Sequence, residues 1–131
     1  LYTHCIIGDS NFYARSIDQD RAIVYRRMLK RLESVIDQNF SLINLDNKLE
    51  FLVCCNIVGY IAPELAARIQ HECSLSVSNE GMFLIDRHNQ FMKSNKKSFV
   101  DSEHRNVLFI MSSSAYPHVL QQELQNSGQP L

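Results

Sequence analysis

The sequence predicts an α+β fold, in which a mixed or largely antiparallel sheet of about five to six strands is covered by three helices. Residues 40–45 alternate between apolar and polar side chains, and residues 49–61 are almost continuously apolar, as in paired strands. Segments on both sides of them repeat apolar residues with a helical period. Because a strand, a turn and a helix open the chain, a three-layer α/β sandwich is the alternative.

Length and composition indicate one globular domain. The chain has 131 residues, of which 45% are hydrophobic and 21% are charged, and its formal net charge is −1. That balance excludes binding of nucleic acid or acidic membrane by the whole surface. No apolar run reaches the roughly 18 residues that span a bilayer, so we expect no membrane segment. The opening Leu-Tyr-Thr-His is neither a signal peptide nor a Met start, which favours a domain excised from a larger protein.

The first elements are a strand and a long helix. Residues 2–8 are apolar and end in the turn-forming Gly-Asp-Ser-Asn of residues 8–11, which predicts a strand. A helix then begins at Asp18 or Asp20, whose carboxylate can cap it, and ends near Asn39. Its apolar stripe has the i, i+3, i+4, i+7 spacing and consists of Tyr25, Met28, Leu29, Leu32, Val35 and Ile36.

A hairpin is predicted next. Residues 40–45 form its first strand, and Asp46-Asn47 form a turn that tolerates positive φ. Residues 49–61 form the second strand, whose apolar run is typical of a strand buried on both faces. The second strand is therefore expected at the centre of the sheet.

Another helix and the remaining strands complete the prediction. Pro63 suits the first turn of a helix, and an apolar stripe follows it. Short strands are expected at residues 82–85, 91–92 and 107–111, and a last amphipathic helix follows them. The stripe of the helix that starts at Pro63 consists of Leu65, Ala66, Ile69 and Cys73, and that of the last helix consists of Val119, Leu120 and Leu124.

The four cysteines are Cys5, Cys54, Cys55 and Cys73, and none of them forms a C-x-x-C pair. Three of them stand in apolar runs, which favours buried free thiols in a reducing compartment, the cytoplasm or the nucleus. A zinc site built from Cys73 and His71 is less favoured, because the spacing of a zinc motif is absent. We therefore expect no metal and no cofactor.

Two short blocks suggest a serine nucleophile. Ser10 follows the first predicted strand on a tight turn, and Asp101 and His104 stand three residues apart. Together the blocks resemble the first and last sequence blocks of the SGNH (GDSL-type) hydrolases. That resemblance implies Ser10 as nucleophile, His104 as base and Asp101 as its partner. The family's middle Gly-x-Asn-Asp block is missing, and its nearest substitute is Asn56.

The same turn resembles a second family. Asp9 after a first strand resembles the first acidic position of the PIN-type nucleases. Their chemistry needs three or four carboxylates around a divalent metal. The other candidates are Glu64, Asp86 and Asp101.

A basic face on the long helix is the candidate binding surface. Four cations span an arc of about 140° opposite the apolar stripe and could contact phosphates or an acidic partner. A solvated face, compensated in part by Glu33 and Asp37, is the favoured alternative. No glycine-rich phosphate loop is present. The four cations are Arg26, Arg27, Lys30 and Arg31.

The favoured function is a non-catalytic protein-interaction domain, scaffold or regulatory, of an intracellular eukaryotic protein. From Asp20 onward, the order of elements resembles the small sheet domains of roadblock and longin modules. The partner would be another protein, bound by a face of the long helix that contains Tyr25 and the basic residues, by the last helix through Tyr116, Val119 and Leu120, or by an unpaired sheet edge. A homo-oligomer fits the same features. Nucleic acid on the basic face is not favoured. The alternative is a small SGNH-like serine hydrolase, or a degenerate hydrolase- or nuclease-like fold that binds RNA or protein.

Overall fold

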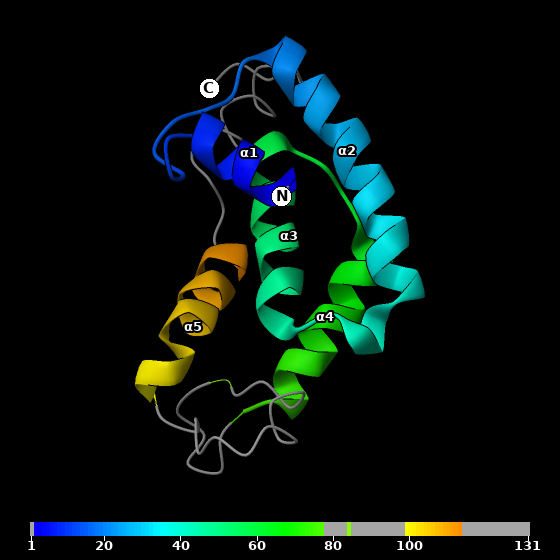
Figure 1. Ribbon diagram of the computed structural model, residues 1–131, viewed down its shortest axis with the longest axis vertical. Coiled ribbons are helices and arrows are strands. Elements are labelled where there is room, and N and C mark those ends of the chain that lie inside the picture. Colours follow the sequence, from blue (N-terminus) through cyan, green and yellow to red (C-terminus); the bar gives the residue numbers. More distant parts are fainter. Residues whose placement is uncertain (1, 78–83, 85–98, 114–131) are drawn as a thin grey trace, which may run out of the picture.

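The computed structural model describes residues 2–77, 84 and 99–113, and these residues form a bundle of helices without any strand (Figure 1). Their only β pairing is an isolated bridge between Val77 and Leu84. The predicted α+β fold and its α/β sandwich alternative are therefore wrong. In chain order the elements are α1 (Tyr2–Asp9), α2 (Gln19–Gln38), the 3-10 turn η1 (Phe40–Leu42), α3 (Leu45–Val58), α4 (Pro63–Leu75) and α5 (Phe99–Ser113).

Helix α3 is the centre of the bundle, and α1, α2, α4 and α5 all pack against it. Ten of its 14 residues are buried, including residues on every side of the helix. A helix with apolar side chains all round needs neighbours all round. The same composition suits a central strand, which is why the hairpin prediction is wrong here. Asn44 caps the helix by accepting from the Asn47 amide at 2.9 Å, and Gly59 ends it with φ +65°.

Helix α1 occupies the residues predicted as the first strand. It buries Thr3, Ile6 and Ile7, which share one face of a helix. Thr3 Oγ1 donates to Glu50 Oε2 at 2.6 Å, and the backbone oxygen of Thr3 lies 3.7 Å from Cys54 Sγ. These contacts fix α1 across the middle of α3.

The predicted helices at α2 and α4 are confirmed. Asp18 caps α2 by accepting from the Arg21 amide at 3.0 Å. Leu29 and Ile36 of the predicted stripe are buried, whereas Val35 is half-exposed. Helix α4 begins at Pro63, and Leu65, Ile69 and Cys73 of its predicted apolar stripe are buried.

Helix α5 contains the residues predicted as the strand 107–111. It packs on α3, where Asn56 Nδ2 donates to the Ser112 oxygen at 2.9 Å. Near the middle of α5 Arg105 is buried, with Nε 3.0 Å from Asp46 Oδ1 in the first turn of α3. Of the strand 82–85 only Leu84 is described. The segment 91–92 and the last predicted helix, with Tyr116, Val119 and Leu120, lie outside the described residues.

Candidate binding surface

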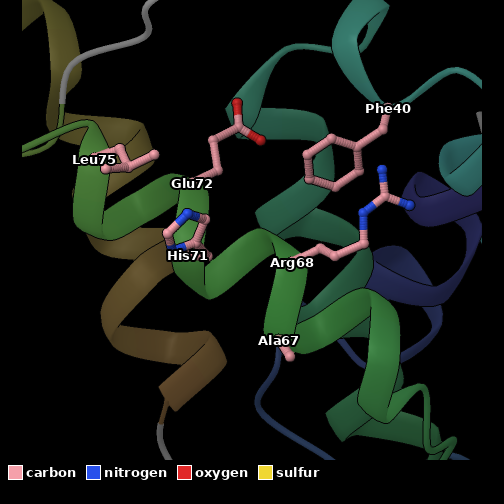
Figure 2. A pocket seen from close by; sticks show the side chains of 6 residues that line it. All are labelled: Phe40, Ala67, Arg68, His71, Glu72 and Leu75. Carbon is pink, nitrogen blue, oxygen red and sulfur yellow. The ribbon is translucent and has the colours of Figure 1, made fainter.

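An open hollow of about 500 Å³ lies along α4, beside η1 (Figure 2). Helix α4 buries Leu65 and Ile69 against α3, which turns Ala67 and His71 outward to solvent. The ring of Phe40 and the side chains of α4 therefore form the lining. The lining residues are Phe40, Ala67, Arg68, His71, Glu72 and Leu75. Most of the surface that they expose to the hollow is apolar, and we call it the apolar hollow.

The Phe40 ring is held in place by two cations. Lys48 Nζ lies 3.9 Å from the ring centroid, and Arg68 Cζ lies 4.1 Å from it. Arg68 in turn pairs with Asp37 near the end of α2. The aromatic wall of the hollow is thus fixed by α2, α3 and α4 together.

Lys48 is a charged residue inside the core. Its side chain is 0% exposed, and Nζ lies 2.5 Å from Glu72 Oε2. A buried ammonium needs such a carboxylate, because burial removes the water that would otherwise solvate it. Glu72 therefore has its charge directed inward, although it also lines the hollow.

A second hollow, of about 310 Å³, lies between α2 and α4. Arg68 lines the first hollow and Asp37 the second, so their ion pair separates the two. The second hollow is acidic, with three carboxylates and one ammonium among its lining residues. These are Lys30, Glu33, Ser34, Asp37, Glu64 and Leu65.

Glu33 accepts a hydrogen bond at this acidic hollow. Its partner is the hydroxyl of Tyr60, which donates to Oε2. Burial, and then the bond to Glu33, raise the pKa of Tyr60 to about 12. Tyr60 is therefore neutral at physiological pH and orients the carboxylate without cancelling its charge.

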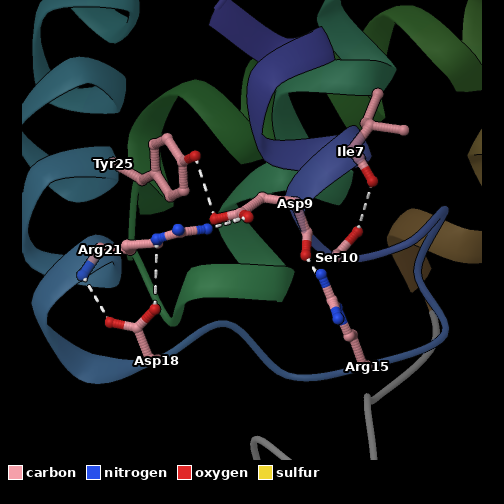
Figure 3. Close-up of polar contacts among 7 residues, drawn as sticks. All are labelled: Ile7, Asp9, Ser10, Arg15, Asp18, Arg21 and Tyr25. Atoms are coloured by element: carbon pink, nitrogen blue, oxygen red, sulfur yellow. Dashed lines mark hydrogen bonds and ion pairs between the residues drawn. The ribbon is translucent and has the colours of Figure 1, made fainter.

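Ser10, the predicted nucleophile, closes the turn between α1 and α2 (Figure 3). It is 0% exposed; its Oγ donates to the Ile7 oxygen at 2.8 Å and accepts from the Tyr13 amide at 3.0 Å. Asn11, Phe12 and Tyr13 all have positive φ, and these bonds hold that unusual run. A strand-supported, exposed serine is absent at this point, and the hydrolase-like fold prediction is wrong.

The predicted partners of Ser10 lie elsewhere. Asp101 and His104 are on α5, and His104 is exposed. Arg105, next to His104, pairs with Asp46 at the start of α3, whereas the partners of the Ser10 hydroxyl are Ile7 of α1 and Tyr13 of the following turn. The structure therefore does not assemble the predicted triad.

The carboxylates of the nuclease resemblance are also dispersed. Asp9 pairs with Arg21 and accepts from the Tyr25 hydroxyl at 3.1 Å (Figure 3). Glu64 is in the first turn of α4, Asp101 is on α5, and Asp86 lies outside the described residues. Among the residues that the structure describes, no group of three or more His, Cys, Asp and Glu side chains could hold a metal ion.

The predicted basic face of α2 is divided. Arg26 is half-buried, and its Nε donates to the Val58 oxygen at 2.7 Å. It therefore binds a terminal carbonyl of α3. Arg27, Lys30 and Arg31 are exposed, and their role in binding stays a prediction.

All four cysteines are free thiols. Cys54, Cys55 and Cys73 are buried, whereas Cys5 is exposed, contrary to its place in an apolar run. Burial raises the pKa of the three buried thiols, to about 11 for Cys73. Because Cys73 points into the core and His71 points to solvent, α4 does not present them as a zinc pair.

The lining of the apolar hollow was missed by sequence reasoning. The sequence predicts Phe40 in a strand. Ala67 and His71 lie on the side of α4 opposite its apolar stripe, where solvent exposure is expected. The burial of Lys48 follows only from the close approach of α3 and α4 to η1. The one available signal was the aromatic Phe40 directly after the end of a capped helix.

No family model matches this chain, and no curated protein or solved structure shows significant similarity to it. None of the helices in the described part of the chain has the length and apolar character needed to cross a bilayer. The function is therefore inferred from the chain's own geometry, above all from the two adjoining hollows along α4.

Proposed function

We propose that this helical bundle is a non-catalytic protein-interaction domain that docks its partner in the apolar hollow along α4. The observation that carries the proposal is the open hollow of about 500 Å³ between Phe40 and Leu75. Its volume suits a bulky side chain of a docked segment, and open apolar surface of this kind is typical of interaction sites.

The rigidity of the lining supports the proposal. Phe40 is fixed between Lys48 and Arg68, and Lys48 is fully buried. A wall that is ordered before binding loses little conformational entropy when a partner docks. The hollow is therefore preorganised for a protein segment.

Exposed apolar side chains extend the same surface. Leu42, two residues after Phe40, is 82% exposed, and Leu75 at the far end of the hollow is 47% exposed. Single exposed apolar residues are common, but Leu75 lines the hollow and Leu42 belongs to the same short turn, η1, as the lining residue Phe40. Together they would bury substantial apolar area against a partner.

The residues that catalysis would need have other roles, which supports a non-catalytic function. Ser10 closes a turn, and Asp9 binds Arg21 and Tyr25. The four free thiols fit a reducing, intracellular compartment. Nucleic acid is disfavoured at these hollows, because carboxylates line the neighbouring one.

The test places a photo-crosslinking amino acid at His71, which faces the hollow, and isolates the adducts formed in cells. Each adducted protein is then purified, and its affinity is measured by calorimetry against the wild type, Ala67→Glu and Ala14→Glu. Ala67 lines the hollow, whereas Ala14 is exposed in the α1–α2 turn and receives the same change.

The proposal predicts a partner whose affinity falls at least about tenfold with Ala67→Glu and stays unchanged with Ala14→Glu. Both changes are at exposed positions, so circular dichroism should show intact helices for both. Adducted proteins that bind Ala67→Glu as tightly as the wild type would refute a docking role for this hollow.

A further inference from the structure

The outer face of α2 carries apolar and basic side chains side by side. Val24 is 53% exposed and Ile23 is 45% exposed, and Arg27 and Arg31 are exposed on the same side. Within the described part of the chain neither arginine has an ion-pair partner. Val24 and Arg31 are seven residues apart, which places them on one face and about 10 Å apart along the axis.

The two hollows along α4 have the complementary arrangement. His71 lines the apolar hollow, and Glu64 lines the acidic hollow. Seven residues of helix separate these two positions, again about 10 Å. The apolar-to-basic spacing on α2 therefore matches the apolar-to-acidic spacing along α4.

We infer that the occupant of the hollows is a second copy of this chain. Helix α2 of one copy lies along α4 of the other, with Val24 over the apolar hollow and Arg31 at the acidic hollow. The inference rests on the proposed function, because it uses the same docking surface.

The direction of the helices lets this contact close on itself. Glu33 meets Tyr60 just before α4, and Asp37 meets Arg68 within α4, so α2 and α4 run the same way (Figure 1). A two-fold axis perpendicular to both helices sets α2 of each copy antiparallel to α4 of the other. Both contacts then form at once, which gives a closed dimer and no open chain.

Charge complementarity favours this occupant. Of the three carboxylates that line the acidic hollow, Asp37 is paired with Arg68, which leaves Glu33 and Glu64 with one ammonium, Lys30. The remaining charge is negative, so the hollow attracts a cation. The Tyr60 hydroxyl donates to Glu33 and adds no positive charge to the hollow. Glu64 lies in the first turn of α4, where the helix dipole stabilises its charge before a partner arrives. Arg31 supplies the missing positive charge.

Sedimentation equilibrium of the full chain is the first measurement. We expect a reversible monomer–dimer equilibrium, with a dimer dissociation constant that rises at least about tenfold in Arg31→Glu and in Glu64→Lys. The chain that carries both changes restores the pair with opposite polarity and should recover most of the affinity. Glu103→Lys, at an exposed position on α5, is the matched control and should leave dimerisation unchanged.

The second measurement maps the contact. Isotope-labelled and unlabelled chains are mixed, with a photo-crosslinking amino acid at Val24 of the labelled chain, and mixed-isotope adducts are sequenced by mass spectrometry. Adducts to residues 67–75 of the unlabelled chain support the dimer. Circular dichroism of every variant confirms that lost dimerisation is not lost folding.

A chain that stays monomeric at millimolar concentration overturns the inference, as does a dimer unaffected by Arg31→Glu and Glu64→Lys. The proposed function fails separately. If the chain is monomeric but the His71 crosslink identifies a different protein whose binding is lost in Ala67→Glu, the docking surface stands and its occupant is that protein.

Discussion

Lys48 Nζ lies 2.5 Å from Glu72 Oε2, and this pair joins the first turn of α3 to α4. The lysine side chain is 0% exposed and also lies against the Phe40 ring. One ion pair thus links the core of the bundle to the lining of the apolar hollow.

Breaking that pair from the carboxylate side should be costly. Glu72→Gln leaves a buried ammonium without its counter-charge, and we expect the free energy of unfolding to fall by about 2–4 kcal/mol. Lys48→Met removes the charge and keeps much of the volume, so its loss should be about 1 kcal/mol. Urea denaturation measures both, with Glu103→Gln as an exposed control. A larger loss in Lys48→Met than in Glu72→Gln would mean that packing, not pairing, matters here.

Ser10 should behave as a structural residue. Ser10→Ala removes the bonds to the Ile7 oxygen and the Tyr13 amide, and we expect a loss of about 1–2 kcal/mol in stability. The native protein should not react with a fluorophosphonate serine-hydrolase probe. Thermal unfolding and in-gel fluorescence test the two statements. Labelling of the folded wild type that disappears in Ser10→Ala would contradict this role.

The thiols should divide into one reactive and three protected groups. Cys5 is exposed, and Cys54, Cys55 and Cys73 are buried with raised pKa values. We expect a disulfide reagent to modify Cys5 alone in the native protein and all four cysteines in urea. Mass spectrometry after digestion identifies the modified positions. Rapid native modification of Cys73 would show that α4 opens readily from the core.

Tyr60 should make stability depend on pH in the alkaline range. Its pKa rises from the usual 10.0 to about 12, through burial first and the bond to Glu33 second. In the unfolded chain the phenol ionises near its usual pKa, while the folded protein keeps the proton. The contribution to stability is therefore complete below pH 10 and is lost as pH rises towards 12.

Tyr60→Phe is the variant for this test, with denaturant unfolding measured at several pH values. It should flatten the fall of stability between pH 10 and 12 and remove one late step from the ultraviolet tyrosine titration. Tyr2→Phe is the control, since Tyr2 is half-exposed. An identical alkaline slope in wild type and Tyr60→Phe would rule out this role.

Two helices could be predicted from the sequence because their signals are local. The Asp18 cap marks where α2 begins, and Pro63 in the first turn marks where α4 begins. In each helix an apolar stripe opposite a polar face shows the helical period. Helix α3 lacks this contrast. Its apolar side chains face neighbours in every direction, and an apolar run without a period fits a central strand equally well.

The candidate site was harder to predict, because its residues gain their roles from tertiary contacts. By its helical spacing Arg26 belongs to the basic face of α2. Its hydrogen bond to the end of α3 depends on tertiary packing. Lys48 stands at the start of an apolar run in the sequence, and no local pattern predicts its burial. Only the packing of α3 against α4 shows that its charge is buried and paired. Arg105 of α5 is likewise charged and buried in the core.

The central position of α3 has a consequence for how the protein unfolds. Because α1, α2, α4 and α5 all contact it, detaching any one of them exposes part of the same apolar cylinder to water. Among the described helices, the most extensive contacts all involve α3, and α1 and α2 contact each other less extensively. The amides of α3 should therefore exchange with solvent only through global unfolding, and the described helices should melt as one cooperative unit.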